Sequence, residues 1–571
     1  MSHHLSTCTF CGVGCGIYLE THQGEITGVY PSMSHPANQG RICVRGWHVH
    51  EIASASDRLH TPLLRKNGAL VPVSFTEAYD FIAKRLTEIR EKHGPDSIGF
   101  LDSARCSNED GYLFQKFARA VIGTNNVDQG TSFYRTTSVQ VLRKMLGIGA
   151  ATNPIQDLFT SRVILLNELD VGQQLPTIGG HIIRARQNGA KLIVVGERRH
   201  RVAEHADIFL NTKPGTAGYL YAAMAKIIID RGFVDFDFVR SRCKGFTEFL
   251  KNIQTFDILF AARRCDVDPA LIEQAALLFA QNRPGMLLYG AGSEEIGEDA
   301  LSAMVNLVLL TGNLAKPGAG IMPLTEHNNA QGGCDMGVMP DYLPGYVRVG
   351  DAEGRARFEK MWNAKLPTAS GLDAAGMFAP PLKLKALWLD RHNPAVSASY
   401  CDANDALQSM EFVVLQNLFL TKTAEHAHVV LPVVAYGEED VTFTSTERRI
   451  QRAVKVVEPL PGLPSAWQQM VEVANRMGAR WTFRSQEDIL REIAETIPVY
   501  EGVTNENLSR GYGRQWPCTH DKPLGTPILF TEASHKFSFA NLHPTPPLEP
   551  EIQEYPFVLS FGHSLYYWHQ N

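Results

Sequence analysis

The chain has 571 residues, of which 44% are hydrophobic and 20% charged, and its formal net charge is −6 at pH 7. This composition is typical of a soluble globular protein and shows no basic footprint for nucleic acid. No apolar run approaches the roughly 20 residues of a membrane span, and the N-terminus shows neither a signal core nor a twin-arginine pair. We therefore expect a cytoplasmic protein of about three or four domains, without a direct membrane span.

Four cysteines near the N-terminus form a C-x2-C-x3-C-x27-C pattern made by Cys8, Cys11, Cys15 and Cys43. A tight loop of three thiolates with a distant fourth can converge on an iron–sulfur cluster. Glycines interleave the first three cysteines, so backbone N–H groups can turn toward the sulfurs. Zinc is the alternative, but zinc sites usually come as two C-x2-C pairs. The spacing favours a [4Fe–4S] cluster, and the other six cysteines are expected to be mostly buried small side chains.

Two sets of short apolar runs follow, each alternating with helical patterns. Strands that alternate with helices indicate parallel α/β sheets. Two such sets predict two nucleotide-binding-type domains, with ligands at the carboxyl ends of the strands. Residues 501–550 are rich in Pro, Gly and Thr and predict an irregular wrap or linker. The apolar runs lie at 96–102, 162–167, 191–196 and 285–290, and then at 385–390, 412–417 and 427–432.

Several longer motifs carry a resemblance to a known family. They are C-T-F-C-G-V-G-C (8–15) with G-R-I-C-V-R-G-W (40–47), L-L-T-G-N-L-A-K-P-G-A-G (309–320), H-N-N-A-Q-G-G-C-D-M-G (327–337) and T-F-T-S-T-E-R-R-I-Q (442–451). Through these motifs the sequence resembles the molybdenum/tungsten bis-pterin oxidoreductases over essentially its whole length. Within that family it resembles the catalytic, or alpha, subunits of formate dehydrogenases.

The resemblance implies an α/β architecture. It has a small N-terminal [4Fe–4S] domain, two Rossmann-like doubly wound domains that each hold one guanine dinucleotide, and a C-terminal β-barrel. In the family about a hundred further residues complete that barrel, so it is expected to be missing here or supplied by another chain, and we favour a separate subunit. The implied domains are 1–58 (cluster, completed by part of 448–540), 59–135 with 336–447 (first α/β), 136–335 (second α/β) and 541–571 (start of the truncated barrel).

The same resemblance implies the cofactors and their contacts. They are the [4Fe–4S] cluster and a bis-molybdopterin guanine dinucleotide with molybdenum or tungsten. Arg45 stands where the family has a lysine that relays electrons between pterin and cluster. The implied cofactor-binding residues are Gly215, Thr216, Gly312, Asn313, Asn328, Asn329, Gln331, Gly332, Gln416, Glu447 and Gln451.

Three positions of the implied catalytic site depart from the formate dehydrogenases. Tyr134 stands where a cysteine or selenocysteine ligates the metal, Arg135 where a histidine follows it, and Thr325 where an arginine holds the substrate carboxylate. A phenol binds a high-valent metal only as phenolate, and its ordinary pKa is near 10. Arg135 is expected to lower that pKa by proximity but cannot act as a base. We read these changes as loss or replacement of formate chemistry.

Nucleotide-recognition positions differ as well. Gly196 and Ala217 stand at family aspartates of one half, and Asn417 and Ser445 at family Asp and Asn positions of the other. A guanine edge that loses its carboxylate partner is left with an unmade hydrogen bond. We therefore expect weaker guanine recognition, more so in the half that contains Gly196 and Ala217.

Three functions stay open at this point. The first is a formate-dehydrogenase-like molybdopterin oxidoreductase with a changed metal ligand and a substrate other than formate. The second is a catalytically inactive iron–sulfur scaffold that passes electrons within a larger redox complex. The third is formate oxidation through an unusual ligand. No NAD fingerprint is present, so we expect a heteromeric complex with electron-transfer subunits that carry further Fe–S clusters or a flavin.

Overall fold

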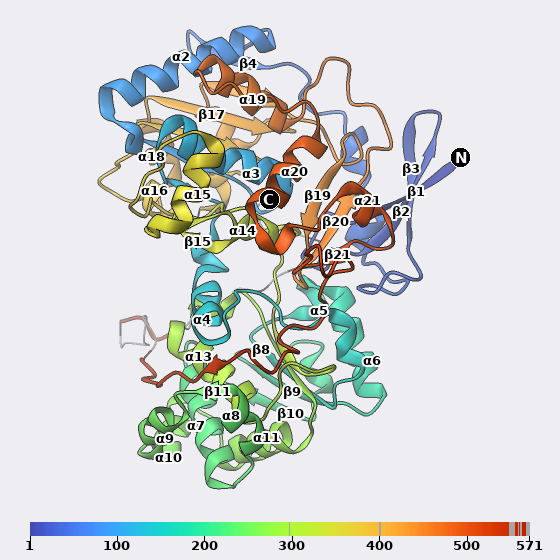
Figure 1. The fold of residues 1–571 in the computed structure, drawn as a ribbon, viewed down its shortest axis with the longest axis vertical. Helices are drawn as coiled ribbons and strands as arrows, with labels where there is room; N and C mark the ends of the chain where they lie inside the picture. The colour runs from blue at the N-terminus through green and yellow to red at the C-terminus, as the bar shows by residue number, and fades with distance from the viewer. Residues whose placement is uncertain are drawn as a thin grey trace.

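The computed structural model describes residues 1–295, 297–398, 401–546, 554–557, 559, 562 and 564–566. Two α/β bodies lie one above the other, and a small antiparallel sheet from the N-terminus lies beside the upper one (Figure 1). That sheet consists of β1 (Ser2–Thr7), β2 (Gly16–His22) and β3 (Glu25–Pro31). The short helix α1 (Val44–Trp47) begins directly after Cys43.

The upper body contains a seven-stranded sheet in the order β5-β4-β18-β17-β16-β6-β7. Strands β6, β7, β16, β17 and β18 are mutually parallel, whereas β4 and β5 are antiparallel at the edge. The central strands are buried along their whole length, as is typical of sheets covered on both faces. The strands are β4 (Leu63–Lys66), β5 (Ala69–Pro72), β6 (Ile98–Leu101), β7 (Val127–Asp128), β16 (Ala386–Asp390), β17 (Phe412–Asn417) and β18 (Val429–Pro432).

The helices of the upper body come from three distant parts of the chain. Residues of α2, α3, α19 and α20 share one hydrophobic core with alternate residues of the sheet strands. The opposite face packs against a second core that includes residues of α16 and α18. The helices are α2 (Phe75–His93), α3 (Asn108–Lys116), α15 (Ala352–Trp362), α16 (Ala374–Phe378), α17 (Pro394–Ser397), α18 (Ala403–Ser409), α19 (Ala466–Arg476) and α20 (Gln486–Thr496).

The lower body contains a five-stranded, fully parallel sheet in the order β10-β9-β8-β12-β13. Counted along the chain, this is the 3-2-1-4-5 order of the Rossmann fold. The fold is therefore α/β with two Rossmann-like sheets, as predicted. The elements are β8 (Val163–Asn167), α5 (Val171–Gln174), α6 (Pro176–Gln187), β9 (Lys191–Gly196), β10 (Ile208–Asn211), α7 (Ala217–Asp230), α8 (Phe236–Arg242), α9 (Phe246–Gln254), α10 (Ile258–Cys265), α11 (Pro269–Gln281), β12 (Gly285–Tyr289), α12 (Gly292–Glu295), α13 (Gly297–Leu310) and β13 (Gly320–Pro323).

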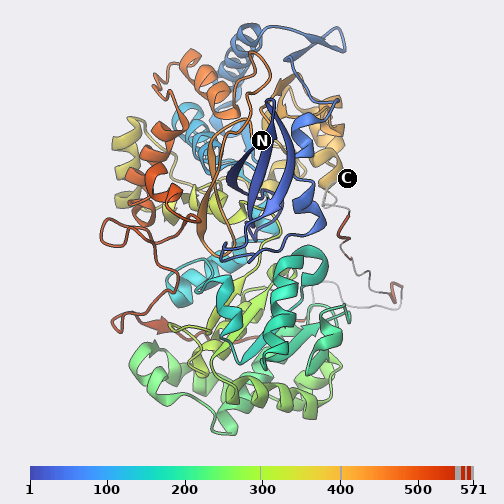
Figure 2. The same cartoon turned by 90° about the vertical axis from the view of Figure 1, so that its right-hand side faces the viewer.

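A third group of segments joins the two bodies to the N-terminal sheet. Strands β19 (Val441–Thr444), β20 (Arg449–Ala453) and β21 (Arg514–Gln515) form a small sheet beside it, as Figure 2 shows. Helices α4 (Thr136–Leu146) and α14 (Ala330–Asp335) lie near the junction of the bodies (Figure 1). The remaining short strands and helix are β11 (Cys243–Lys244), β14 (Tyr342–Leu343), β15 (Val347–Arg348), β22 (Phe537–Ser538) and α21 (Asn505–Ser509).

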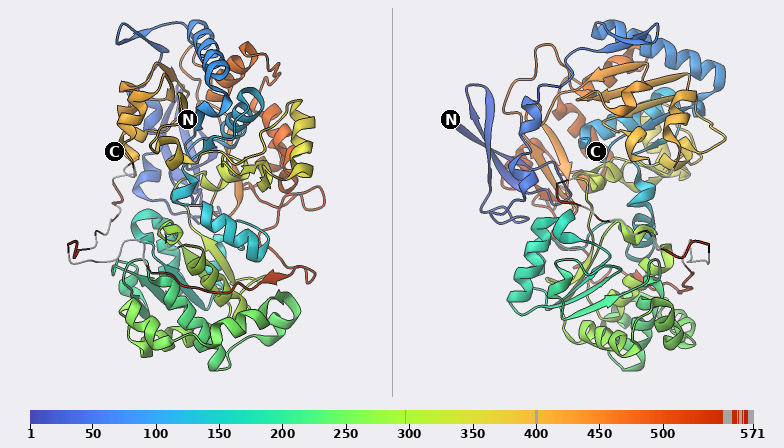
Figure 3. Two further views of the ribbon diagram at one scale, coloured as in Figure 1. Left: turned by 90° about the vertical axis from the view of Figure 1, so that its left-hand side faces the viewer. Right: turned by 180° about the vertical axis from the view of Figure 1, so that it is seen from behind.

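The last part of the described chain runs as a strap across the lower body (Figure 3). It is mostly irregular, as the Pro- and Gly-rich composition predicts, and β22 pairs with β11 of the lower body. The predicted opening of a barrel at 541–571 falls largely outside the described residues, and those described there form no strand. Within the described parts of the chain, no helix is both long and apolar enough to cross a membrane.

Candidate functional site

The first three cysteines lie in a loop closed by the first two strands. Because Thr7 pairs with Gly16 in the sheet, the ends of the loop meet, and the Cys8 N–H donates to the Cys15 carbonyl at 2.8 Å. Gly14 has φ +60°, a conformation that favours glycine. Burial raises the pKa of Cys11 to about 11, against the lowering influence of Arg45. Such thiols become thiolates when a metal replaces their protons.

The separation of the four thiols distinguishes a cluster from a zinc ion. Cys8, Cys11 and Cys15 are buried and Cys43 is half-buried, and the other three are close enough to Cys15 to raise its pKa. Among the described residues, no three of these sulfurs lie within 4.8 Å of one another. Four thiolates around one zinc ion would lie about 3.8 Å apart, given a Zn–S distance of about 2.3 Å. The wider spacing fits a polynuclear cluster better than a single ion.

Arg45, the predicted relay residue, lies between the cysteine loop and the lower body. Its Nη2 donates to the carbonyl of Gln174 at 2.7 Å, and its guanidinium lies 5.0 Å from the ring centre of Phe10. Arg105 lies 5.5 Å from the same ring, and burial lowers its pKa to about 10. Two cations thus flank the loop, and both attract thiolate charge.

Two predicted site residues, Gln451 and Thr325, contact the cysteine loop. The Gln451 Nε2 donates to the carbonyl of Gly14 at 3.0 Å. A Cβ on Gly12 would lie 2.2 Å from the carbonyl oxygen of Thr325, so the two segments touch. The N–H of Thr325 donates to the Thr446 hydroxyl at 3.1 Å, and the N–H of Thr446 donates to the Gly12 carbonyl. Thr325 is therefore packed against the cluster loop.

Tyr134 follows a single 3-10 turn (Thr131–Phe133), and its hydroxyl turns back on that turn. The hydroxyl donates to the Gln129 carbonyl at 3.0 Å, and the ring lies 5.2 Å from that of His327. Burial raises the pKa of Tyr134 well above its ordinary value, with smaller contributions from Cys334 and two aspartates. Arg135 lowers this pKa, as its proximity predicts, but burial outweighs that effect and the phenol keeps its proton.

Arg135 is fully buried at the start of α4. Its Nη2 donates to the Gly149 carbonyl at 2.8 Å and also to Gln331 Oε1. Its Nε and Nη1 have no hydrogen-bond partner within the described part of the chain. Gln331 in turn donates to Asp335 at 2.8 Å, and burial raises the pKa of Asp335 to about 6. The structure therefore brings Arg135 and Gln331 together, as the resemblance implies.

Three of the predicted cofactor-binding residues lie in or just before α14. Asn328 and Asn329 precede the helix, and Gly332 lies within it. Both polar atoms of the Asn328 amide are buried, and neither has a hydrogen-bond partner among the described residues. Asn329 is engaged, since it donates to the Cys106 carbonyl at 2.8 Å and accepts from the Thr444 N–H at 2.7 Å. A Cβ on Gly332 would lie 2.1 Å from the Asn329 side chain, so glycine is required there.

Other predicted residues lie elsewhere. Gly312 and Asn313 are at the amino end of β12, where Asn313 Oδ1 accepts from the Gly285 N–H at 2.9 Å, away from the carboxyl edge where ligands bind. Gly312 and Asn313 form a turn, in which Gly312 has φ +63°, a conformation that favours glycine. Thr216 follows β10 at the carboxyl edge, next to Gly215, and its hydroxyl donates to the Lys213 carbonyl.

Gln416 and Glu447 are both engaged within the protein. Gln416 Oε1 accepts from the Trp388 indole at 2.8 Å. Glu447 accepts from the Ile155 N–H at 2.6 Å and pairs with Arg449 at 2.6 Å.

Sequence reasoning missed a further group of polar residues at the carboxyl ends of β6 and β16. The signal was available, because each of these buried strands ends in or is followed by an aspartate. The group consists of Asp102, Cys106, Asp110, Asp390 and Arg391.

Comparison with known families agrees with this geometry. Residues 58–476 match the model of the molybdopterin oxidoreductase family, and residues 1–55 match the molybdopterin oxidoreductase Fe4S4 domain. The chain belongs to the molybdopterin oxidoreductase family. These two domains indicate a [4Fe–4S] cluster and a molybdopterin cofactor, and the cysteine-loop geometry fits the former.

Relatives of this oxidoreductase are formate dehydrogenases. The chain is 35% identical over 98% of its length to the F420-dependent formate dehydrogenase 1 subunit alpha of Methanococcus maripaludis, and covers 84% of that protein. It is 34% identical over 98% of its length to formate dehydrogenase H of Escherichia coli, and covers 81% of it. Acetylene hydratase from Pelobacter acetylenicus has the same fold, with a TM-score of 0.74, 21% identity, and coverage of 94% of this chain and 77% of that one. The protein is thus a formate-dehydrogenase-like molybdopterin oxidoreductase with an Fe4S4 domain.

The residues near α14 fit a polar cofactor. Buried polar groups are normally hydrogen-bonded, because an unmade bond costs about 1–3 kcal/mol. The Asn328 amide and two nitrogens of Arg135, whose third nitrogen donates to Gln331, are buried without partners among the described residues. These are hydrogen-bonding groups of the kind that a pterin ring and its phosphate require. Asn328 and Arg135 would hold such a group when it is present.

Proposed function

We propose that this chain is the pterin-binding subunit of a formate-dehydrogenase-like oxidoreductase whose metal receives no thiolate from this chain and whose substrate is not formate. The observation that carries the proposal is the Tyr134 hydroxyl, which donates to the Gln129 carbonyl and keeps its proton. A neutral phenol is a poor ligand for a hard, high-valent metal, which binds phenolate.

The neighbours of Tyr134 also argue against formate as the substrate. Arg135 is always charged and cannot accept a proton, so it cannot replace a general base. Thr325 is neutral and its backbone is held against Thr446 and Gly12, so it cannot pair with a carboxylate as an arginine does. When bound, the metal–pterin supplies oxidation–reduction at the substrate, and the cluster carries single electrons onward. This chain's residues position the groups and exclude water.

Partners are part of the proposal. The relatives from methanogens are named as alpha subunits, and each belongs to a formate dehydrogenase with other subunits by that name. Five large apolar side chains on the cluster domain of this chain are exposed: Met1, Tyr30, Met33, Trp47 and Ile52. Exposed apolar groups of this size are suited to a protein interface. We infer that an electron-transfer subunit with Fe–S clusters or a flavin docks there, and that a separate subunit completes the C-terminal barrel.

The second candidate is an inactive iron–sulfur scaffold of a larger redox complex. The observation that favours it is the same protonated Tyr134, together with an acidic cluster at the carboxyl edge of the upper sheet. Metal analysis of the protein purified with its partners separates the two. The enzyme would contain about one molybdenum or tungsten atom per chain. Iron alone, at about four atoms per chain, would contradict the enzyme and support the scaffold.

Two matched variants test the metal's ligands. Tyr134→Phe removes only the hydroxyl, so the X-ray absorption spectrum of the molybdenum or tungsten is expected to stay unchanged. Tyr134→Cys with Arg135→His is expected to add one sulfur to that spectrum and to give viologen-linked formate oxidation that the unaltered protein lacks. Thr325 is left in place because it packs on the cluster loop. A changed spectrum in Tyr134→Phe, or formate oxidation by the unaltered protein at the rate of the double variant, would contradict the proposal.

A further inference from the structure

The upper sheet has a topological switch point between β6 and β16. Its parallel strands, taken in chain order, have the 2-1-3-4-5 arrangement, with β6 and β16 as the first and third. From β6 the chain crosses to β7 on one side, and from β16 it crosses to β17 on the other. In doubly wound sheets, the crevice outside the carboxyl ends of such a strand pair is where nucleotide ligands bind.

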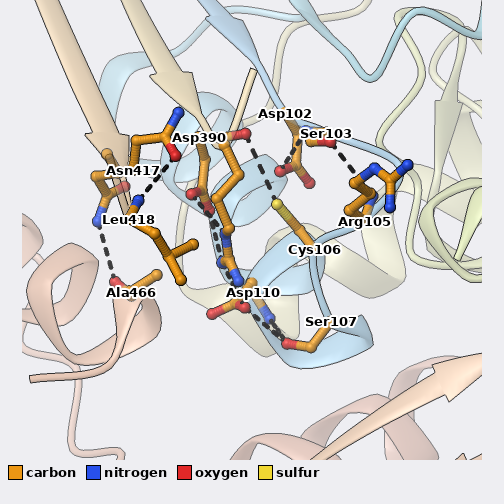
Figure 4. A network of polar contacts seen from close by, with 12 residues as sticks. Asp102, Ser103, Arg105, Cys106, Ser107, Asp110, Asp390, Asn417, Leu418 and Ala466 are labelled. Atoms are coloured by element: carbon orange, nitrogen blue, oxygen red, sulfur yellow. Dashed lines mark hydrogen bonds and ion pairs between the residues drawn. The ribbon is translucent and has the colours of Figure 1, made fainter. Parts of the chain in front are cut away.

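This crevice is filled by charged side chains. Asp102 directly follows β6 and Asp390 ends β16, and their carboxylates lie within 4.8 Å of each other and of the Cys106 sulfur (Figure 4). Arg391 donates from Nε to Asp390 at 2.9 Å and from Nη2 to Asp110 at 2.6 Å. We call Asp102, Cys106, Asp110, Asp390 and Arg391 the switch-point cluster.

The charge of the cluster opposes an anion. The three aspartates are each at most 1% exposed, and one guanidinium pairs with two of them, Asp110 and Asp390. Both carboxylate oxygens of Asp390 accept hydrogen bonds from Arg391, so the guanidinium already occupies the place that a bound cation would take. A pyrophosphate in this crevice would have to approach buried carboxylates without any uncommitted cation of the cluster.

The backbone of the crevice is also unsuited to phosphate. The turn after β6 reads D-S-A-R-C-S (102–107) and contains no glycine that would allow close backbone approach. The hydroxyl of Ser107 caps α3 by accepting from the Asp110 N–H at 3.0 Å. Glu109 and Asp110 place two carboxyl groups in the first helical turn. The N-terminus of α3 is therefore already capped, and two carboxyl groups already interact with its helix dipole. A phosphate site, in contrast, uses free N–H groups at a helix N-terminus.

The switch point of the lower sheet, between β8 and β12, has a different turn and different strand-end hydrogen bonds. After β12 the chain reads G-A-G (290–292), and a Cβ on Gly290 would lie 2.5 Å from the Leu169 side chain, which packs directly on this turn. Asn167 ends β8 and makes neutral hydrogen bonds with Ser293 at 2.8 Å and Tyr221 at 2.6 Å. Glu168 directly follows β8, and Glu294 of α12 accepts from the Ser138 N–H at 2.8 Å, so this edge also carries carboxyl groups. It differs from the upper edge in its glycine turn and in the neutral partners of the strand-end residue Asn167.

We propose that the switch-point cluster closes the crevice of the upper sheet to dinucleotide phosphates, so that this chain holds at most one nucleotide, on the lower sheet. This inference rests on family membership and on the fold, and does not depend on the proposed substrate. It distinguishes this chain from the arrangement that the resemblance implies, in which each Rossmann-like domain holds one dinucleotide.

Two measurements test the closure. The nucleotide released from the full chain on denaturation, counted by mass spectrometry, is expected to be at most one per chain. The Asp110→Asn/Asp390→Asn variant removes two charges, keeps the side-chain shapes and frees Arg391. It is expected to bind one inorganic pyrophosphate more per chain than the unaltered protein in equilibrium dialysis. Arg391→Gln in the same background should abolish that extra binding. A matched control, Asp57→Asn/Asp521→Asn, makes the same charge change at exposed positions.

The outcomes are separable from those of the proposed function. Two nucleotides per chain would overturn the closure, whatever metal is present. So would an unaltered protein that binds as many pyrophosphates as the double variant, or a double variant that gains none. If the double variant does not fold, the nucleotide count on the unaltered protein still decides. A preparation that contains neither molybdenum nor tungsten would contradict the proposed enzyme. The nucleotide and pyrophosphate counts would still decide whether the crevice of the upper sheet is closed.

Discussion

The two Rossmann-like sheets present very different carboxyl edges. At the lower sheet, Asn167, Glu168 and a G-A-G turn lie at the switch point. At the upper sheet, three buried aspartates and Arg391 lie at the equivalent place. The strands that flank both switch points are parallel, although the two sheets differ in strand order, so the contrast in polar groups lies in a few residues at strand ends. The architecture provides two candidate crevices, and local chemistry determines which of them can accept an anion.

The largest effect should come from Arg391→Met. Removing the guanidinium leaves Asp110 and Asp390 buried without their cation, and breaking such a pair costs about 3–5 kcal/mol. We expect the urea midpoint, followed by tryptophan fluorescence, to fall strongly at neutral pH. The loss should shrink at low pH, where the carboxyls can protonate. A midpoint that does not change would mean that the cluster is not a paired charge group.

Glu109 should give the upper body a pH-dependent stability. Burial raises its pKa from 4.5 to about 7. Between these values the folded state holds a proton that the unfolded state releases, so the free energy of unfolding falls as pH rises through this window, by about 3 kcal/mol. Glu109→Gln should flatten that slope in urea titrations at several pH values. An equally steep slope in the variant would assign the dependence to other groups.

A substitution at the carboxyl edge of the lower sheet should lower the free energy of unfolding less than Arg391→Met does. Asn167→Ala removes hydrogen bonds with Ser293 and Tyr221 and leaves the Tyr221 hydroxyl buried without this partner. The expected loss is about 1–3 kcal/mol, because neutral groups are involved. It should show no pH dependence between pH 5 and 8, in contrast to Arg391→Met. A pH-dependent loss would mean that Glu168, which follows Asn167 and helps to raise the pKa of Tyr221, is coupled to these hydrogen bonds.

The smallest effect is expected for Asp102→Asn. Burial and the neighbouring Asp390 raise the pKa of Asp102 well above its ordinary value, so its carboxyl keeps a proton to higher pH than an ordinary aspartate does. An amide of the same shape should then change stability by less than about 1 kcal/mol. A loss as large as that of Arg391→Met would mean that Asp102 is ionised and that the cluster carries more negative charge than the structure indicates.

Much of the architecture follows from local sequence. The buried strands at 98–101, 386–390 and 412–417 coincide with runs recognisable by their apolar length, because a strand covered on both faces must be apolar throughout. The cysteine spacing predicts a cluster loop, and Thr7 and Gly16 close it. Gly312 and Asn313 show the limit of this reasoning. Their motif suggested a cofactor contact, but only the strand direction reveals that they lie at the amino edge of the sheet.

The sequence by itself determined the α/β class, the four cysteines and the resemblance to pterin oxidoreductases, because these depend on local periodicity, spacing and residue type. The tertiary structure decided the pKa of Tyr134, since burial outweighs the adjacent Arg135. It also decided that Asp102 and Asp390, distant in sequence, meet at one crevice. Burial and convergence depend on how parallel strands are ordered in a sheet, and no single segment of the chain contains that information.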